Sequence, residues 1–382
     1  MLKNVKIKKI LKNTVFKCAT ALNKVVPKDE SIVLLYSGNR GIWNNLKALK
    51  DYLLNNNYDK KYRIVCGIES MQYAEEDSDR VEYMTKIRSF LLFLRAYRVF
   101  YTAGQIPIKP ARNQMVIHMD HGTAAIKTGG ALSKINNGDE FFFTHYLVPS
   151  PIYIPIAVAE YLCKEENVLV CGETSTDVMF HKYNTYDLGD FKKIIFWAPT
   201  FRQSDYFGYD DSSEELLPLF VESEYEQLND VLKKYNFKLI VKLHPGQDLR
   251  GYSKLFYSNL YIYSDLEFKK TGMDIYHLMP QVDFLLADYS SVYLQYLLLD
   301  KPMAFVVPDM EEYAQKRGFI FENPLDFMPG QIIKTKEQFW KCLEDVNNEV
   351  DYYSQKRKEV RDKVYTYQDG KNCERVIKIA KM

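Results

Sequence analysis

The chain has 382 residues, a length that exceeds one small core and suits two domains of ordinary size. Its apolar fraction of 47% is typical of a folded globular protein. Its 51 basic and 50 acidic residues give a formal net charge of +1 at pH 7, so no overall field favours nucleic acid as a partner. The six cysteines form no CxxC pair and no zinc-ligand spacing, which predicts reduced, cytosolic thiols rather than a disulfide framework.

The first 28 residues contain eight lysines and no acidic residue. Apolar residues recur there at three- and four-residue spacing, at Ile7, Leu11, Val15, Cys18, Leu22 and Val25. One interpretation is a basic amphipathic helix that lies on an anionic bilayer. The other is a terminal helix that packs on the protein body and leaves its lysines in water. No continuous apolar run of a cleavable signal is visible in this segment.

Short apolar runs alternate with helical patterns in the first half of the chain. Strands are predicted at 31–38, 62–68, 98–104, 114–120 and 167–173, and helices at 46–56 and 84–96. The apolar segment 141–163 carries three prolines, His145 and Glu160, so it is predicted as a strand, a turn and a buried helix rather than a membrane span. Because the strand runs are continuously apolar, both faces of a mostly parallel sheet should be covered.

A second α/β series follows the polar stretch 181–193. Strands are predicted at 193–200, 237–245, 260–265, 283–291 and 302–309, and helices at 216–235 and 273–280. The tail should be helical and charged at 336–348, 356–365 and 374–382. We expect two doubly wound α/β domains that face each other across a central cleft. Ligands of such sheets bind beyond the carboxyl ends of the strands.

Polar and ionisable residues follow several of these strands. Lys242 and His244 alternate with Leu243, so both side chains should point to one face and suit a phosphate. Ser290 and Ser291 are expected to begin a helix, whose free N–H groups favour an anion. Arg202 adds a possible bidentate clamp. Each such residue could equally be a cap or a structural residue, but together they predict a diphosphate site without a Walker loop.

The first half contributes the run Asp120-His121-Gly122-Thr123 after a predicted strand. Gly122 permits close approach of a substrate, and Lys127 follows on an anion-friendly loop. His121 titrates near neutrality, which makes it the predicted general base. No group of acidic residues has the spacing of metal ligands, although Mg²⁺ bound to a nucleotide stays possible.

The motifs WAPTFR, KLHP, DFLLADYSSVYLQYLLLDKPMAF and PDMEEYAQKRGFIFE resemble those of the CDP-glycerol glycerophosphotransferases of teichoic acid synthesis, of primase or polymerase type. The resemblance runs in order over residues 31–375. It implies a GT-B-like fold of two Rossmann-type domains, the second of which binds the nucleotide. It also implies transfer of glycerol phosphate from CDP-glycerol to a hydroxyl of a lipid-linked saccharide. The enzyme would be peripheral, at the cytoplasmic face of an anionic membrane.

The resemblance also implies roles for individual residues. His121 would activate the acceptor and His244, beside Lys242, would bind the transferred or leaving phosphate. The serines at 290 and 291 would hold the diphosphate, with Asp288 bracing their turn. Nucleotide recognition or cleft closure would fall to Glu311, Tyr313 and Arg317, and the acceptor side would comprise Asp120, Gly122, Thr123 and Lys127.

One departure concerns the acceptor side, because the family usually has Trp before HGT, where this chain has Asp120. An acidic neighbour is compatible with a histidine base oriented by a carboxylate, or with a different acceptor. The predicted regions are a membrane-associating helix at 1–28, an acceptor domain at 29–185, a donor domain at 186–365 and a C-terminal helix at 366–382. Alternatives are a CDP-ribitol or capsular alditol-phosphate transferase and, more distantly, a UDP-sugar epimerase or an inactive scaffold. Oligomeric state is not predicted.

Overall fold

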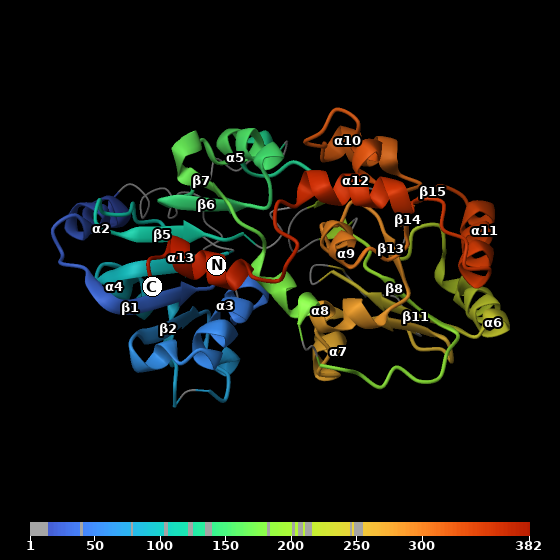
Figure 1. The fold of residues 1–382 in the computed structure, drawn as a ribbon, viewed down its shortest axis with the longest axis horizontal. Helices are drawn as coiled ribbons and strands as arrows, with labels where there is room; N and C mark the ends of the chain where they lie inside the picture. The colour runs from blue at the N-terminus through green and yellow to red at the C-terminus, as the bar shows by residue number, and fades with distance from the viewer. Residues whose placement is uncertain are drawn as a thin grey trace. The chain divides into compact units, whose positions relative to one another are not determined.

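The chain forms two compact units, each built around its own parallel sheet (Figure 1). The computed structural model describes residues 14–38, 41–77, 79–102, 106–120, 125–133, 140–181, 184–200, 203–204, 209–210, 216–244, 247 and 255–382. Unit 1 comprises residues 1–123, 137–177 and 366–382, and unit 2 comprises residues 124–136 and 178–365.

Unit 1 contains a seven-stranded parallel sheet in the order β3-β2-β1-β4-β5-β6-β7. Its strands are β1 (Asp29–Tyr36), β2 (Arg63–Ile68), β3 (Glu82–Thr85), β4 (Ala96–Tyr101), β5 (Met115–His118), β6 (His145–Val148) and β7 (Val168–Val170). Its helices are α2 (Val15–Asn23), α3 (Asn44–Asn55), α4 (Lys86–Phe93), α5 (Ile154–Tyr161) and α13 (Asn372–Ile379).

Both faces of this sheet are covered, as continuous apolar strands require. Along β1, Val33 and Leu35 join a core with α3 and α13, whereas Ile32 and Leu34 join a second core with α2 and α4. The alternation follows from the two-residue period of a strand, and it confirms the doubly wound architecture predicted from the sequence.

Unit 2 contains a six-stranded parallel sheet in the order β12-β11-β8-β13-β14-β15. Its strands are β8 (Lys193–Trp197), β11 (Phe237–Lys242), β12 (Leu260–Tyr263), β13 (Phe284–Ala287), β14 (Met303–Val306) and β15 (Gln331–Ile333), and a separate antiparallel pair joins β9 (Gln203–Ser204) to β10 (Tyr209–Asp210). Its helices are α6 (Tyr225–Tyr235), α7 (Asp265–Lys270), α8 (Ile275–Leu278), α9 (Val292–Tyr296), α10 (Met310–Lys316), α11 (Lys336–Asn347) and α12 (Ser354–Val364).

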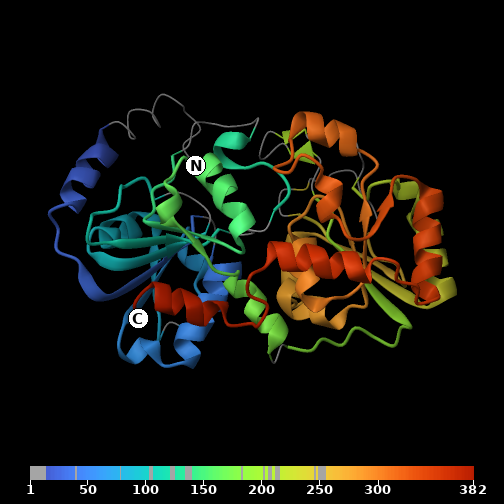
Figure 2. The ribbon, with the colours of Figure 1, turned by 45° about the horizontal axis from the view of Figure 1, so that its top comes forward.

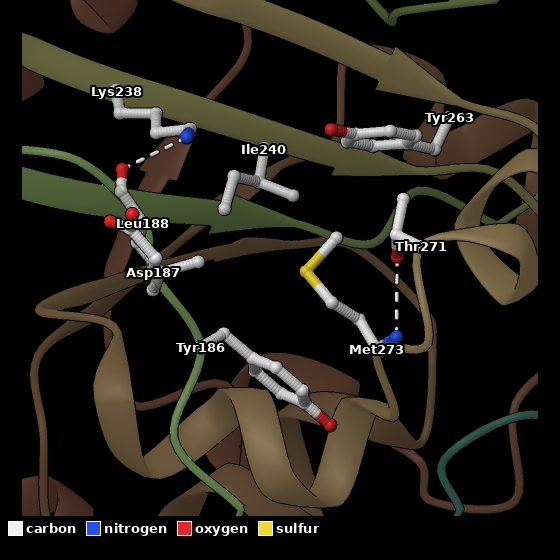
Figure 3. Close-up of a pocket in the computed structure, with 8 residues that line it drawn as sticks. All are labelled: Tyr186, Asp187, Leu188, Lys238, Ile240, Tyr263, Thr271 and Met273. Carbon is white, nitrogen blue, oxygen red and sulfur yellow. Dashed lines mark hydrogen bonds between the residues drawn. The ribbon is translucent and has the colours of Figure 1, made fainter.

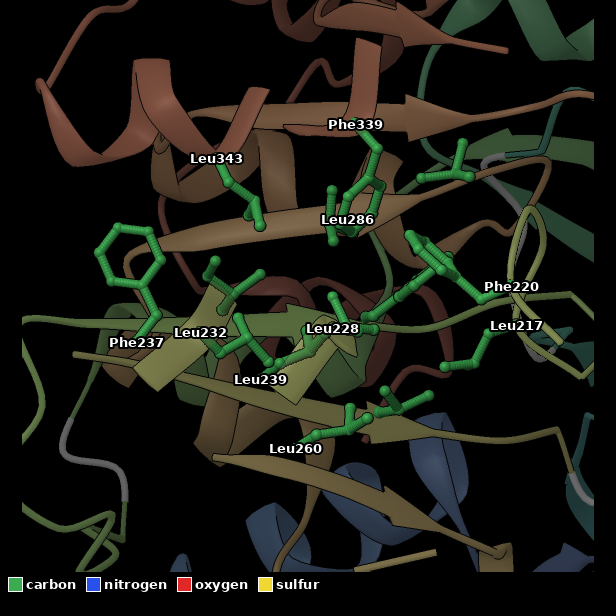
Figure 4. Close-up of a cluster of buried hydrophobic side chains, with 14 of the residues drawn as sticks. Leu217, Phe220, Leu228, Leu232, Phe237, Leu239, Leu260, Leu286, Phe339 and Leu343 are labelled. Carbon is green, nitrogen blue, oxygen red and sulfur yellow. The ribbon is translucent and has the colours of Figure 1, made fainter. Parts of the chain in front are cut away.

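One face of this sheet packs against α6 and α11 (Figure 4). Leu228 and Leu232 of α6 and Phe339 of α11 contact a core that includes Leu239 of β11 and Leu286 of β13. All five side chains are almost fully buried, and burying a Leu or Phe side chain contributes about 1.5–3 kcal/mol. This apolar cluster thus holds the strands β8, β11, β13 and β14, which the sequence motifs follow, on one face of the sheet.

The two units depart from the predicted domain boundaries at two places. Helix α13, predicted as a separate C-terminal helix, belongs to unit 1 because the Arg98 guanidinium donates to the carbonyl oxygens of Ala380 (2.8 Å) and Lys381 (2.7 Å). Its N-terminus is capped by the Asp177 carboxylate, which accepts from the Cys373 N–H at 2.7 Å. Residues 125–133, predicted in the first domain, pack instead on unit 2, where the Ile320 N–H donates to the Ile126 carbonyl.

Helix α2 lies at the margin of unit 1 and is the dark-blue helix in Figure 2. Phe16 and Ala19 pack against the second core of unit 1, to which α4 also contributes. Val15, Cys18 and Leu22 are exposed. The helix therefore packs on the body and also presents an apolar stripe outward; the predicted residues Ile7 and Leu11 lie outside the described residues. Among the residues described, none of the helices has the length and apolar character needed to traverse a bilayer.

Candidate functional site

The carboxyl ends of β11, β8, β13 and β14 meet at one edge of the unit 2 sheet. The chain forms β8 first, adds β11 and β12 on one side, and then returns to add β13, β14 and β15 on the other. The order therefore reverses between β8 and β13. Ligands of open α/β sheets bind at such a reversal, beyond the carboxyl ends of the strands. The predicted donor residues that the structure describes follow these strands.

Asp288 lies at this reversal and is fully buried. Its carboxylate accepts hydrogen bonds from the Thr200 N–H (2.7 Å), the Thr200 hydroxyl (2.7 Å) and the Ser290 N–H (3.1 Å). A buried carboxylate needs such donors, and here they tie the end of β8 to the turn after β13. Asp288 is thus placed to brace the turn rather than to contact a ligand, and Thr200 is a partner that the sequence did not reveal.

The serine pair precedes α9 as predicted. Ser291 occupies the position before Val292, with helical backbone angles, and the Val292 N–H donates to the Ser290 hydroxyl at 3.4 Å. Both serines are partly exposed, and the residues that follow them, Tyr293 to Leu298, are buried. The sequence thus presents two hydroxyls at the carboxyl edge and anchors them through the apolar face of the helix behind them.

The segment after β14 lies beside this turn. Tyr289 donates its hydroxyl hydrogen to Asp309 (2.9 Å), and its ring stacks on the Tyr313 ring with centroids 4.0 Å apart. Tyr313 is buried, so it serves packing here, whereas Glu311 is exposed on α10. Arg317 ends α10, and its carbonyl accepts from the Thr128 hydroxyl at 2.8 Å. Tyr313 therefore packs against the turn through Tyr289, whereas Arg317 contacts the segment 125–133.

Lys242 is the last residue of β11, and His244 lies two residues further along the chain. The Lys242 ammonium lies 3.1 Å from the Asp265 carboxylate, and Lys269 contacts the same carboxylate at 2.8 Å. Burial lowers the pKa of Lys242, and Asp265 opposes that effect. Burial would raise the pKa of Asp265, but the two lysines outweigh it and lower that pKa. Lys242 is thus engaged by the first turn of α7, while His244 is partly exposed at the edge itself.

On unit 1, Asp120 follows β5, and its carboxylate accepts hydrogen bonds from the hydroxyls of Tyr146, which is buried, and Tyr161, which is partly buried. Lys127, predicted on the acceptor side of the first domain, lies instead in unit 2, where it forms a backbone bridge with Phe319. The predicted residues Arg202, His121, Gly122 and Thr123 lie outside the described residues.

The described residues include no group of three or more His, Cys, Asp or Glu side chains that could hold a metal ion. They do include a cavity of about 230 Å³ on unit 2, lined by Tyr186, Asp187, Leu188, Lys238, Ile240, Tyr263, Thr271 and Met273 (Figure 3). No predicted donor residue lines it. The Lys238 ammonium already donates to the Leu188 carbonyl at 2.9 Å and lies over the Tyr261 ring, so we do not place the donor there.

A family model identifies the family, and curated relatives agree with it. The family model of CDP-Glycerol:Poly(glycerophosphate) glycerophosphotransferase matches residues 18–380. The chain is 27% identical over 385 residues to the teichoic acid ribitol-phosphate polymerase TarK of Staphylococcus aureus, covering 95% of this chain and 71% of that protein. It is 24% identical to a teichoic acid poly(glycerol phosphate) polymerase of Bacillus spizizenii, over 85% of this chain and 86% of that one. Against TarL of Staphylococcus aureus, at 27% identity, it spans 62% of the relative's length.

Solved structures show the same fold. The wall teichoic acid polymerase TagF superposes with a TM-score of 0.71 at 18% identity, covering 98% of this chain and 95% of that chain. A UDP-N-acetylglucosamine 2-epimerase shares the architecture more distantly, with a TM-score of 0.53 at 12% identity, 92% of this chain and 95% of that one. The GT-B-like fold of two Rossmann-type units is therefore confirmed. The chain belongs to the CDP-glycerol:poly(glycerophosphate) glycerophosphotransferase family and is a CDP-alditol phosphotransferase of the teichoic acid type.

Proposed function

We propose that the chain transfers glycerol phosphate from CDP-glycerol to a hydroxyl of a membrane lipid-linked acceptor and releases CMP. The observation that supports this most is the arrangement of the donor motifs: Asp288, Ser290 and His244 follow strands that meet at the order reversal of unit 2. The family match spans both units and supplies the reaction class.

The proposed chemistry is an attack of the acceptor oxygen on the β-phosphorus of the donor. A new P–O bond forms to the acceptor, the P–O bond to CMP breaks, and the acceptor proton passes to His121. Negative charge spreads over the phosphoryl oxygens in the transition state, so positioning and electrostatic stabilisation carry most of the catalysis. His244, Arg202 and the Ser290–Ser291 turn are the proposed partners of the diphosphate. We propose no protein-bound cofactor; Mg²⁺ would arrive with the nucleotide.

A second candidate donor is CDP-ribitol. Two of the relatives, TarK and TarL, are ribitol-phosphate polymerases and share 27% identity with the chain over more than nine tenths of its length. Both donors have the same cytidine and diphosphate, which the motif residues would contact. The choice between them therefore depends on residues near the alditol. An alditol-phosphate transferase of capsular polysaccharide synthesis stays a further alternative.

The proposed function is tested by incubating the purified chain with CDP-glycerol, CDP-ribitol and UDP-GlcNAc and measuring nucleotide release in the presence of a lipid-linked saccharide. CMP from one CDP-alditol is expected, with no change to UDP-GlcNAc. The His121→Ala variant should bind the CDP-alditol as wild type but release no CMP. Epimerised UDP-GlcNAc would favour the epimerase, and no reaction with any of the three would contradict the transferase.

We also propose that unit 1 docks on an anionic membrane surface, at the cytoplasmic face where the lipid acceptor would lie. Phe16 of α2 and Phe90 of α4 meet edge to face with ring centroids 6.1 Å apart, which places the two helices side by side. Around this contact, Val25 is 75% and Ile87 76% exposed, and Leu22 and Leu91 are also exposed. Both helices thus carry exposed apolar side chains, and we propose that these form one surface, which we call the α2/α4 face.

The charge of the α2/α4 face suits such a surface. Neither residues 1–28 nor residues 83–119 contain an acidic residue. Lys17 and Lys24 are exposed on or next to α2, and Arg88 and Arg95 on or next to α4. Each basic side chain near an anionic bilayer adds about 1 kcal/mol, and exposed apolar side chains beside it add burial in the interface.

A further inference from the structure

Asp120 is held from three elements of unit 1. Its carboxylate oxygen Oδ2 accepts hydrogen bonds from the Tyr146 hydroxyl of β6 at 2.6 Å and from the Tyr161 hydroxyl at the end of α5 at 3.0 Å. The Asn45 side-chain amide, in the first turn of α3, donates to the backbone carbonyl of Asp120 at 3.0 Å and to that of Met119 at 3.2 Å. Asn45 is in turn fixed by the Thr174 hydroxyl, which donates to its backbone carbonyl at 2.8 Å.

The backbone at this point is unusual. Asp120 has φ of +54°, in the left-handed region that non-glycine residues seldom adopt. Such a conformation persists when the surroundings determine it, and it tends to occur at functional sites. Here the chain leaves β5, turns at Asp120 and continues directly into His121. The contacts that hold Asp120 therefore fix the residue to which the proposed base is directly bonded.

The tyrosines act as donors in this arrangement. Tyr146 is buried and Tyr161 is partly buried; burial first, then the Asp120 carboxylate, raises the pKa of each hydroxyl well above its usual range. They consequently stay protonated at neutral pH and donate to the carboxylate. Among the described residues, polar groups near them include the Tyr101 hydroxyl of β4, the His118 ring, which stacks on Tyr146 with centroids 5.0 Å apart, and Glu160 beside Tyr161.

We infer that Tyr146 and Tyr161 are positioning residues for the phosphoryl transfer: their hydroxyls fix the Asp120 carboxylate and, through it, the backbone that carries the proposed base. The inference rests on the proposed function, in which His121 takes the acceptor proton. It accounts for the two tyrosine hydroxyls beside Asp120, because a carboxylate in an aromatic enclosure requires hydrogen-bond donors. The partners lie 26 and 41 residues from Asp120 in sequence.

Tyr101 offers a matched control for a purely structural role. It is a buried tyrosine of the same aromatic cluster, with its ring 4.4 Å from that of His118, but its hydroxyl donates to the Phe142 carbonyl at 3.3 Å. A Tyr→Phe change at 101, 146 or 161 removes one hydroxyl from one ring of this cluster in each case. The three variants should lose comparable stability, whereas only those at 146 and 161 release Asp120.

The experiment measures steady-state kinetics with the preferred CDP-alditol and a lipid-linked acceptor for wild type, Tyr101→Phe, Tyr146→Phe and Tyr161→Phe, each with a thermal melt. We expect kcat to fall about tenfold to hundredfold for the variants at 146 and 161, with KM for the donor unchanged, because a small displacement of a catalytic group costs that much. In the Asp120→Asn background the same changes should add no further loss, since the tyrosines act through Asp120.

The outcomes separate the two ideas. If Tyr146→Phe and Tyr161→Phe keep the kcat of Tyr101→Phe, or if their effects add fully to that of Asp120→Asn, the positioning role is wrong while the transferase stands. Should Tyr146→Phe fail to fold, Tyr161→Phe, which loses the longer of the two bonds, decides alone. A wild type that turns over neither CDP-alditol overturns the proposed function, and with it this inference.

Discussion

At the residue scale, Asp288 is the group on which the donor turn depends. Replacing it with Asn keeps the size but removes an acceptor from the Thr200 or Ser290 N–H groups, which should cost about 1–3 kcal/mol of unfolding free energy. Because the turn carries the proposed diphosphate contacts, KM for the CDP-alditol should also rise. Chemical denaturation and steady-state kinetics measure the two effects.

Asp283 provides the control for that change. It lies at the other end of the same strand, and its carboxylate accepts from the Ile194 N–H at 2.7 Å. Asp283→Asn should therefore lower stability without changing KM for the donor. If the two variants change KM equally, Asp288 has no particular relation to donor binding.

Asp265 makes the second prediction at this scale, because its pKa is lowered in the folded chain by Lys242 and Lys269 against the effect of burial. A carboxyl group whose folded pKa is depressed stabilises the fold above its unfolded pKa, about 3.9, and that contribution is lost as the pH falls through the folded value. The difference in Tm between wild type and Asp265→Asn should be full at pH 6–7 and shrink towards pH 3. A difference that stays constant over this range would show that the ionised carboxylate contributes nothing.

At the scale of elements, the exposed stripe of α2 is separable from its packed face. Deleting residues 1–26 would remove Phe16 and Ala19 from the core of unit 1, so lost membrane binding in that variant could reflect unfolding. Point changes on the α2/α4 face avoid this problem because the side chains are exposed. The sequence left two alternatives for this helix, packing on the body and docking on a membrane. Because its two faces differ, one helix can do both.

The prediction compares Val25→Glu and Ile87→Glu with Leu266→Glu, which is 62% exposed on α7 of unit 2. Each change on the α2/α4 face should weaken binding to anionic vesicles roughly tenfold or more, because burial of one such side chain is worth about 1.5–3 kcal/mol. The Leu266 variant should bind as wild type, and added salt should weaken all of them. Cosedimentation that gives the same affinity for all three variants would exclude this face as the docking surface.

The structure confirms the ten predicted strands of the two series. It also confirms the prediction of a strand, a turn and a helix at 141–163. These elements could be predicted because continuous apolar runs are a strong sequence signal for strands covered on both faces. The short strands β3, β9, β10 and β15 were missed. Glu82–Thr85 merges with the start of an apolar helical pattern, so that helix was predicted from residue 84 although α4 begins at Lys86. Likewise, the region 216–235 was predicted as one helix, whereas α6 begins at Tyr225.

The sequence predicted the motif residues of the candidate site but not the side chains that hold them by hydrogen bonds. The sequence indicated Asp288 and the serine turn, and local spacing sufficed because these residues adjoin in the chain. The Thr200 contact to Asp288, the Asp265 contact to Lys242 and the tyrosine contacts to Asp120 join residues 23 to 88 positions apart. Such pairs depend on the order of strands in the sheet, which single-residue patterns do not determine.

At the scale of the whole molecule, neither unit is one continuous segment. Unit 1 is completed by α13 from the end of the chain, and unit 2 incorporates residues 125–133 from between β5 and β6. A fragment cut at residue 185 would lack Val376 and Ile377, which are buried in the unit 1 core. Experiments on either half of the proposed reaction therefore require the full chain.

The central claim, alditol phosphate transfer, is tested most directly by the mass of the acceptor after reaction. The full chain is incubated with a synthetic lipid-linked saccharide and CDP-glycerol or CDP-ribitol, and the lipid product is examined by mass spectrometry. We predict that the acceptor gains the mass of one or more alditol phosphate units from one of the two donors, and that the number of units distinguishes a primase from a polymerase. An acceptor of unchanged mass with both donors, beside a folded chain that binds the nucleotide, would contradict the account.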